Sequence, residues 1–305
     1  MHFDQQNPLD IVLNDLFDHY SENVKDVKKI TRELLARGVI SSQKDIVNDH
    51  IAFRTLGVPH LGIRSFEKIF LAYGYKREDA YHFEGKKLDA YWYSPPAEGY
   101  PRIFVSELIV SALSESAQQT IHSYTSKITA DPVDELDLND GKQVADFLQR
   151  PLWDLPTSED YQTLLRESEY AAWVIYNRYY LNHYTISIHE LQDGYNTLES
   201  FNAFLESISI KLNSSGGTIK TSEDGLLRQS STVSALYGAR FSDGVTLEIA
   251  GSYVEFAERG ILPAFRGLPL SEIKAKHRRD GFETNNADRI FESTYTDQIK
   301  GANNK

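Results

Sequence analysis

The first forty residues have the apolar spacing of helices. Apolar side chains recur three or four residues apart from Pro8 to about Gly38, where the glycine ends the pattern. They are Leu9, Ile11, Val12, Leu16, Phe17, Tyr20, Val24, Val27, Ile30 and Leu34. This spacing predicts one or two helices, and we assign residues 1–45 to an N-terminal helical segment ahead of the core.

The rest of the chain alternates between strand-like and helical stretches. Residues 51–55 are predicted to form a strand, residues 65–73 a helix, and residues 87–93 and 102–110 two more strands. The polar stretch 114–178 is predicted to be mostly helical. After it come a predicted strand at 184–189, a helix at 197–212, and strands near 232–241 and 253–257. Ser242-Asp243-Gly244, between the last two strands, is typical of a hairpin turn.

The two halves of the chain share one order of elements. Each begins with a histidine at the start of a strand, His50 or His183, and closes on a strand that contains a glutamate, Glu107 or Glu255. This order predicts an α+β fold in which two βαβββ-like modules form a cupped central sheet with surrounding helices. We assign residues 1–305 to one domain, with modules at 46–112 and 181–262, a helical connection at 113–180 and a C-terminal extension at 263–305.

Composition limits the partners and the chemistry. The net charge of −12 opposes binding to a nucleic-acid backbone, and no apolar run approaches the roughly 20 residues that span a membrane. We therefore expect neither nucleic acid nor a membrane as a partner. The N-terminus lacks a signal-peptide pattern, which predicts a cytoplasmic protein. Because the chain has no cysteine, a bound metal would need histidine and carboxylate ligands.

Four side chains in equivalent places of the two modules are candidate metal ligands: His50, Glu107, His183 and Glu255. Because alternate residues of a strand face the same side, Arg54 is expected to share the face of His50. Imidazole with carboxylate suits iron, manganese, nickel or zinc, and two histidines with one carboxylate are typical of non-haem Fe(II) sites. Each residue alone has a structural explanation, such as an ion pair. Their coincidence in two similar modules favours a metal site.

Family resemblance supports this interpretation. The chain contains NDHIAFRT at 48–55, LNHYT at 181–185, SYVEFAER at 252–259 and GFETNNAD at 281–288. These stretches resemble the 2-oxoadipate dioxygenase/decarboxylase family, also called hydroxyglutarate synthase, and the likeness extends over roughly residues 45–295. The resemblance implies a sheet similar to that of the vicinal oxygen chelate superfamily, with Fe(II) held by His50, His183 and Glu255. It also implies that Arg54 grips the distal carboxylate of the substrate.

The same resemblance implies a reaction. An enzyme of this family would use Fe(II) and O2 to convert 2-oxoadipate, or a related 2-oxo acid, to 2-hydroxyglutarate and CO2, a step of lysine breakdown. Zinc, nickel or manganese could occupy the site in a purified sample. The expected partners are therefore a 2-oxo acid and O2. The sequence does not indicate how many chains associate.

Several of these assignments have alternatives. Glu248 follows an Asp-Gly turn, as the final ligand does in glyoxalase-like sheets, but we prefer Glu255 because Glu107 is expected to be its counterpart. Gln229 and Ser231 are candidate substrate contacts, although a turn or strand-edge role explains each as well. A glyoxalase-like isomerase or lyase would use all four candidate ligands, Glu107 included. A non-catalytic protein would sequester a dicarboxylate without O2 uptake.

Overall fold

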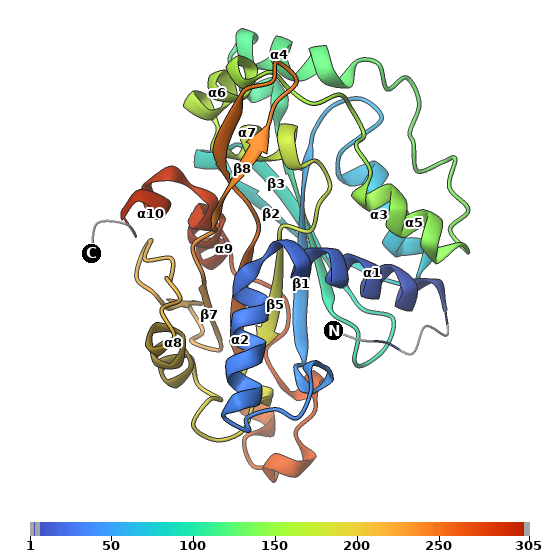
Figure 1. The fold of residues 1–305 in the computed structure, drawn as a ribbon. Coiled ribbons are helices and arrows are strands. Elements are labelled where there is room, and N and C mark those ends of the chain that lie inside the picture. The colour runs from blue at the N-terminus through green and yellow to red at the C-terminus, as the bar shows by residue number, and fades with distance from the viewer. Residues whose placement is uncertain (1–2, 4–6, 302–305) are drawn as a thin grey trace.

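A curled eight-stranded sheet forms the centre of the protein (Figure 1). The computed structural model describes residue 3 and residues 7–301. The strands lie in the order β2 (Lys76–Phe83), β3 (Leu88–Ser94), β4 (Arg102–Leu108), β1 (Asn48–Leu56), β5 (His183–Ser187), β10 (Tyr253–Arg259), β7 (Leu227–Ser231) and β6 (Lys220–Thr221). Two further strands, β8 (Leu236–Arg240) and β9 (Thr246–Ala250), form a separate hairpin.

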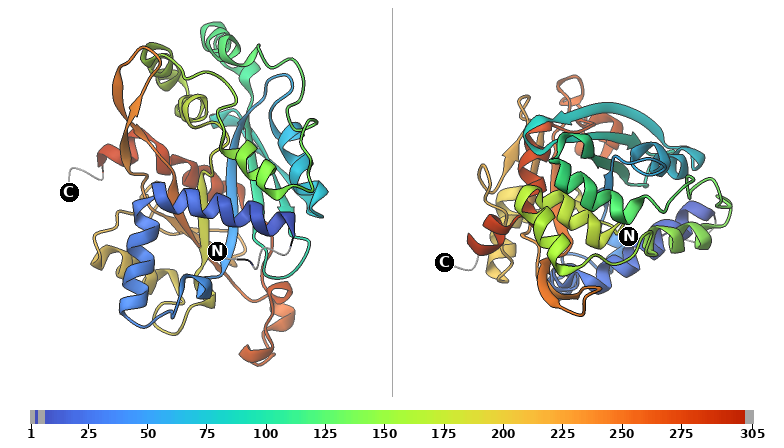
Figure 2. Two further views of the ribbon diagram at one scale, coloured as in Figure 1. Left: turned by 45° about the vertical axis from the view of Figure 1, so that its right-hand side comes forward. Right: turned by 90° about the horizontal axis from the view of Figure 1, so that it is seen from above.

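The sheet has two similar halves that meet between β1 and β5. β1 runs parallel to β4 in the first half, and β5 runs parallel to β10 in the second. The two halves join through the antiparallel pair β1–β5. The predicted α+β fold with two βαβββ-like modules and a cupped sheet is confirmed, whereas the module boundaries stay predictions. The view from above in Figure 2 shows the blue-green strands of the first half arching across one side of the molecule.

Helices surround this sheet. They are α1 (Pro8–Asn23), α2 (Lys25–Ala36), α3 (Ile63–Ala72), α4 (Glu115–Thr125), α5 (Gly141–Gln149), α6 (Ser158–Glu167), α7 (Glu169–Asn177), α8 (Leu198–Ser207), α9 (Thr284–Phe291) and α10 (Thr296–Gly301). Single 3₁₀ turns lie at η1 (Gln43–Asp45), η2 (Glu84–Lys86), η3 (Val110–Ala112), η4 (Ile188–Glu190), η5 (Pro263–Phe265), η6 (Leu270–Glu272), η7 (Ala275–His277) and η8 (Glu292–Thr294). Among the described residues, no helix has the length and apolar character that a membrane span requires.

The two faces of the sheet have different covers. On one face, Phe17 of α1 packs on Tyr184 of β5, and Phe66 of α3 packs on Phe53 of β1. On the other face, α9 contacts β2, β6 and β7, so it reaches both edges of the sheet and fills its cup. Because strand residues alternate between faces, His50 and His183 point into this cup.

Sequence patterns missed β2, β6, β7 and β9. β2 is an edge strand whose side chains are mostly exposed, so it lacks the apolar alternation that marks a strand. The Ser242-Asp243-Gly244 turn does join a hairpin, but the hairpin consists of β8 and β9 rather than strands of the central sheet. The strand predicted near 232–241 corresponds to β8, which is shorter and lies outside the central sheet, because β7 ends at Ser231 and β8 pairs with β9.

Candidate metal centre

Strand register brings His50, His183 and Glu255 together on the cup side of the sheet. In β1–β5, Ala52 pairs with His183. In β10–β5, Glu255 pairs with Thr185. His183 Nε2 lies 3.3 Å from His50 Nε2 and 3.1 Å from Glu255 Oε2. His50 Nε2 lies 3.5 Å from Glu255 Oε1. All three side chains are buried, and strands of both halves contribute to the group.

The three donor atoms have the spacing of metal ligands. Ligand atoms about 2.1 Å from an ion and at right angles to each other stand about 3 Å apart. One donor atom from each of His50, His183 and Glu255 lies within 4.8 Å of the other two. Two imidazole nitrogens and one carboxylate oxygen suit a divalent transition metal. The group could therefore bind a metal.

The residue before each histidine holds the outer ring nitrogen. His50 Nδ1 lies 2.8 Å from Asp49 Oδ1, and His183 Nδ1 lies 3.0 Å from Asn182 Oδ1. Because both oxygens accept, each Nδ1 donates and each Nε2 is left for a metal. The halves differ in one respect: a carboxylate orients His50, whereas a neutral amide orients His183.

Asp49 is itself held by two arginines. Arg259 donates to its carboxylate from Nε at 2.6 Å and from Nη2 at 2.9 Å. Arg102 Nη1 lies 3.5 Å from Asp49 Oδ2. Burial raises the pKa of Asp49, but Arg259 and Arg102 outweigh burial and bring that pKa well below its usual value. Asp49 is therefore ionised and can accept the proton of the His50 ring.

Burial and charge act differently on the two histidines. Burial lowers the pKa of His50, but Glu255 and Asp49 outweigh it and raise that pKa above its ordinary value. Burial, with His50 and Arg54 as positive neighbours, holds the pKa of His183 well below its ordinary value. His50 thus favours its protonated, positively charged form beside Glu255. A bound cation would take the place of this proton.

Arg54 is buried beside this group and has no carboxylate partner in the part of the chain that the structure describes. Its side chain is 1% exposed, and it forms no ion pair within the described part of the chain. Nη1 donates to Thr294 Oγ1 at 3.0 Å and Nη2 to the Phe291 carbonyl at 3.1 Å, whereas Nε has no partner. The guanidinium also lies over the rings of Tyr170 and Trp173, at 5.1 and 5.2 Å from their centroids. Ring contacts offset part of the cost of burying a cation but do not neutralise it.

The candidate substrate contacts Gln229 and Ser231 are engaged with protein groups. Gln229 Nε2 donates to Glu255 Oε1 at 2.6 Å, and Asn286 donates to the Gln229 oxygen at 3.0 Å. Gln229 therefore orients Glu255. Ser231 Oγ lies 2.9 Å from Ser293 Oγ, also buried. A substrate contact from either residue stays a prediction.

Glu107 points away from the metal group. It pairs with Thr55 of β1, on the face of the sheet that α3 covers. Glu107 Oε2 accepts a hydrogen bond from the backbone N–H of Ile63, the first residue of α3, at 2.7 Å. Gly62 has a φ of +82°, and a Cβ there would lie 2.1 Å from Glu107 Oε2, so this position requires glycine. Glu107 therefore serves as a helix cap.

Strand register also corrects the expected equivalence of Glu107 and Glu255. The equivalent pairs that fix the comparison are His50–Arg102 and His183–Tyr253. Counting along β4 and β10 from these pairs, the counterpart of Glu255 is Phe104, and the counterpart of Glu107 is Glu258. Glu258 Oε2 accepts from the first N–H of α8 at 2.9 Å, as Glu107 does for α3. The alternative residue Glu248 is exposed on the separate β8–β9 hairpin.

The C-terminal segment closes the cup over the candidate metal centre. Phe282, Ala287, Ile290 and Phe291 line, together with the metal group, a cavity of about 20 Å³. Arg259 Nη1 donates to the Gly281 carbonyl at 2.8 Å and so fixes the chain next to Phe282. A cavity of this size holds about one water molecule. A six-carbon acid would therefore need this cover to move.

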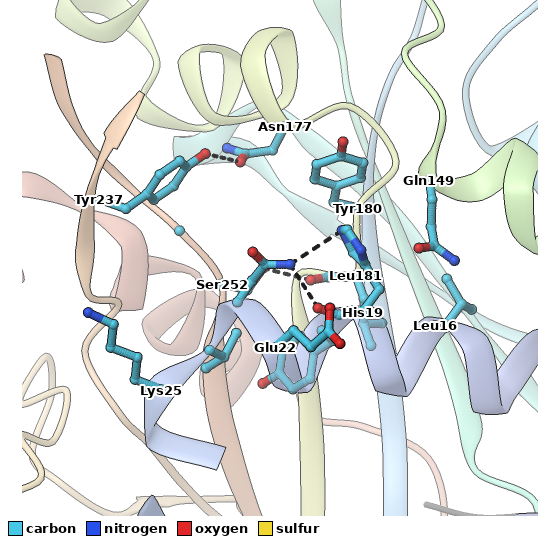
Figure 3. A pocket seen from close by; sticks show the side chains of 14 residues that line it. Leu16, His19, Glu22, Lys25, Gln149, Asn177, Tyr180, Leu181, Tyr237 and Ser252 are labelled. Atoms are coloured by element: carbon cyan, nitrogen blue, oxygen red, sulfur yellow. Dashed lines mark hydrogen bonds between the residues drawn. The ribbon is translucent and has the colours of Figure 1, made fainter. Parts of the chain in front are cut away.

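A larger cavity of about 450 Å³ lies on the opposite face of the sheet (Figure 3). Residues of α1, including His19, line it together with Tyr180 and Tyr237, and Tyr237 donates to Asn177 Oδ1 at 2.8 Å. None of the three candidate ligands borders it. We therefore place the candidate site at the smaller cavity, which the two histidines and Glu255 line.

Comparisons with known proteins agree with this geometry. Residues 12–273 match the 2-oxoadipate dioxygenase/decarboxylase family. The chain is 45% identical to the chloroplastic 2-oxoadipate dioxygenase/decarboxylase of Arabidopsis thaliana, over 87% of this chain and 72% of that protein. The chain belongs to this family. A second family member, from Oryza sativa subsp. japonica, is 46% identical over 83% of this chain and 71% of its own length.

Solved structures extend the family comparison. The hydroxyglutarate synthase of Oryza sativa in complex with 2-oxoadipate has a TM-score of 0.85 and 42% identity, and the match covers 95% of this chain and 92% of that one. A glyoxalase superfamily protein from Ralstonia eutropha JMP134 has a TM-score of 0.69 at 20% identity, over 91% of this chain and 87% of that one. The second likeness shows that the family shares the glyoxalase-like fold.

The family members correct one prediction. A cytoplasmic location was expected, but the Arabidopsis relative is named chloroplastic and the rice relative chloroplastic/amyloplastic. The expectation depended on the absence of a signal-peptide pattern, and such an absence carries no information about a cellular compartment.

Sequence reasoning assigned no role to several residues of the site. Asp49 and Asn182 precede the two histidines, and that shared position was the available signal. Arg259 and Tyr253 follow and precede Glu255 on its face of β10, so strand alternation could have selected them. Asn286 gave no sequence signal for its contact with Gln229, because the contact depends on how α9 enters the cup.

Proposed function

We propose that this family member is an Fe(II)-dependent dioxygenase/decarboxylase that converts 2-oxoadipate, or a closely related 2-oxo acid, with O2 to 2-hydroxyglutarate and CO2. The atoms balance, since one oxo acid and one O2 give one hydroxy acid and one CO2. The observation that carries the proposal is a buried group of two histidines and one glutamate beside a buried arginine that pairs with no carboxylate of the described residues. Family membership supplies the substrate class.

His50, His183 and Glu255 would hold the metal. When bound, Fe(II) supplies the binding and reduction of O2 that an oxidative decarboxylation needs. Three protein ligands leave open positions on a six-coordinate ion, which is typical of non-haem iron oxygenases. Asp49 and Asn182 keep each Nε2 directed at the metal, and the apolar cover of the cup excludes water from the reacting groups.

Arg54 would bind the distal carboxylate of the substrate. A planar guanidinium suits a carboxylate, and a buried cation without a counter-ion is costly until an anion arrives. A structural ion pair was the alternative explanation for Arg54, and no described carboxylate lies within ion-pair distance of it. Gln229 and Ser231 remain proposed contacts for the rest of the substrate.

A glyoxalase-like reaction with four protein ligands has less support. The position that would carry the fourth ligand is Phe104, and Glu107 lies on the other face of the sheet. A purely sequestering protein would use the same anion-binding groups but would consume no O2.

An oxygen-uptake experiment tests the proposal. Purified protein is freed of metal, reloaded anaerobically with Fe(II), Mn(II) or Zn(II), and mixed with O2 and a panel of 2-oxo acids. We expect only the Fe(II) form to consume O2, with equal amounts of O2 lost and of CO2 and 2-hydroxyglutarate formed from 2-oxoadipate. Binding of 2-oxoadipate without O2 uptake would instead support the sequestering protein. Turnover without O2 would support the glyoxalase-like reaction.

Arg54→Met tests the carboxylate assignment, because methionine fills much of the space without the charge. We expect kcat/KM for 2-oxoadipate to fall by an amount equivalent to about 2–4 kcal/mol, and that for the monocarboxylic 2-oxohexanoate to fall far less. Arg178→Met is the matched control, since Arg178 is also buried and donates to the Trp153 carbonyl away from the site. An unchanged ratio of the two substrates, at equal metal content, would remove Arg54 from the substrate site.

A further inference from the structure

Two buried hydrogen-bond donors beside the metal group lack a well-formed hydrogen bond within the described residues. Arg54 Nε and the Tyr253 hydroxyl are both shielded from solvent, and among the described residues neither forms a hydrogen bond of normal geometry, although Arg54 contacts the Tyr253 hydroxyl. Each side chain is 1% exposed. Nearly all buried polar groups in folded proteins are hydrogen-bonded, so two unpaired groups in one site require an explanation.

Tyr253 is fixed at the candidate metal centre. It precedes Glu255 by two residues on β10 and pairs with His183 of β5, so the three side chains share one face. Its ring lies 4.8 Å from the His183 ring, centroid to centroid, and lines the same small cavity. The Tyr20 hydroxyl donates to the Tyr253 carbonyl, which anchors the backbone from the opposite face of the sheet.

The hydroxyl of Tyr253 also lies near Arg54. Arg54 acts on this hydroxyl through its charge and as a side-chain hydrogen-bond donor. The phenol O–H donates to no described residue, so it is available to a ligand. Arg54 can only donate, because a guanidinium has no acceptor. A ligand that accepts from the phenol O–H and opposes the charge of Arg54 would satisfy both groups, and a carboxylate can do so with its two oxygens.

We propose that the Tyr253 hydroxyl donates a hydrogen bond to the distal carboxylate of the substrate and so helps to select dicarboxylic 2-oxo acids. This inference rests on the proposed function. Tyr253 and Arg54 form a two-sided clamp: Arg54 supplies charge, and Tyr253 supplies a directed neutral donor. The other two nitrogens of Arg54 already bind Thr294 and the Phe291 carbonyl, which leaves Nε as the nitrogen without a hydrogen bond of normal geometry among the described residues.

Tyr253→Phe tests the clamp because it removes one oxygen atom and keeps the ring on His183. Tyr184→Phe is the matched control: the Tyr184 hydroxyl is also buried and unpaired within the described residues, but it faces α1 on the other side of the sheet. Both variants are loaded with Fe(II), and metal content and melting temperature are measured before kinetics. Without substrate, Tyr253→Phe should melt no lower than wild type, since the hydroxyl donates no hydrogen bond to another described residue.

The substrates compared are 2-oxoadipate and 2-oxohexanoate, which differ in the distal carboxylate. For Tyr253→Phe we expect kcat/KM for 2-oxoadipate to fall about 10- to 100-fold, mainly through KM, and that for 2-oxohexanoate to change less than about 3-fold. Tyr184→Phe should change neither. In anaerobic protein, 2-oxoadipate should raise the melting temperature of wild type more than that of Tyr253→Phe.

Each other outcome overturns a defined statement. Equal losses for both substrates would place the hydroxyl at their shared 2-oxo acid end and overturn the distal assignment. No loss would mean that water or nothing binds the hydroxyl, and the clamp would fall while the proposed function stands. If wild type neither bound nor turned over 2-oxoadipate, the proposed function and the clamp would fall together.

Discussion

Asp49→Asn should weaken metal binding by about 10- to 100-fold, equivalent to about 1.4–2.7 kcal/mol. The wild-type carboxylate accepts from His50 Nδ1 at 2.8 Å and from Arg259 Nε at 2.6 Å. Asparagine has one oxygen for these donors. If its oxygen faces His50, its NH2 group opposes Arg259 Nε–H. If its oxygen faces Arg259, the NH2 group drives the His50 proton onto Nε2, which is the nitrogen needed for the metal.

Loss of the Asp49–Arg259 pair should also lower stability, because an uncompensated buried charge costs about 3–5 kcal/mol. Metal affinity is therefore measured by competition with a chromophoric chelator at a temperature where the folded fraction is verified by circular dichroism. Asp131→Asn is the control: Asp131 accepts from Ser65 and pairs with Lys68 far from the metal group. It should lower stability without changing metal affinity. Wild-type affinity in folded Asp49→Asn protein would refute the orienting role of Asp49.

Three further predictions concern other groups. His183→Ala should reduce metal content from about one ion per chain to a small fraction, checked by elemental analysis of folded protein. Glu107→Ala and Glu258→Ala should each leave metal content unchanged and lower the free energy of unfolding by about 1–2 kcal/mol, because each removes a helix cap. Loss of metal in Glu107→Ala would contradict the placement of Glu107 on the other face of the sheet. Burial and the charge of Arg278 lower the pKa of His189 to about 4. Between pH 6.5 and 4 the unfolded chain therefore binds a proton at His189 that the folded chain does not, so the free energy of unfolding should fall by up to about 3 kcal/mol as pH falls. In His189→Gln, measured by urea unfolding, this pH-dependent loss of stability should disappear.

Elements with regular patterns could be predicted from the sequence, and elements without them could not. The N-terminal apolar spacing predicted helices where α1 and α2 lie, and the strands bearing His50, His183 and Glu255 were found near their true bounds. β2 was missed because an exposed edge strand needs no apolar face. The role of α9 was missed because its contacts with both sheet edges depend on the curl of the whole sheet.

Repeat symmetry was a sound guide to the histidines and a misleading one to the glutamates. His50 and His183 are equivalent by register, but Glu107 and Glu255 differ by three residues in their equivalent strand positions. An odd offset in a strand reverses the face of the sheet, so Glu107 became a helix cap while Glu255 entered the cup. The sequence could not reveal this, because both segments are apolar strands with one embedded glutamate. Where the first half could have supplied a fourth ligand it supplies Phe104, whose ring packs against Phe282 at 4.9 Å between centroids. A symmetric fold thereby produces an asymmetric, three-ligand group that is open on the side of the first half, beside Arg54 and under the C-terminal cover.

A carboxylate placed at this position, by Phe104→Glu, should raise metal affinity and abolish O2 uptake, because it would occupy a metal position that the oxygenase reaction needs open. Oxygen uptake at the wild-type rate in the metal-loaded variant would show that the number of protein ligands does not set the reaction.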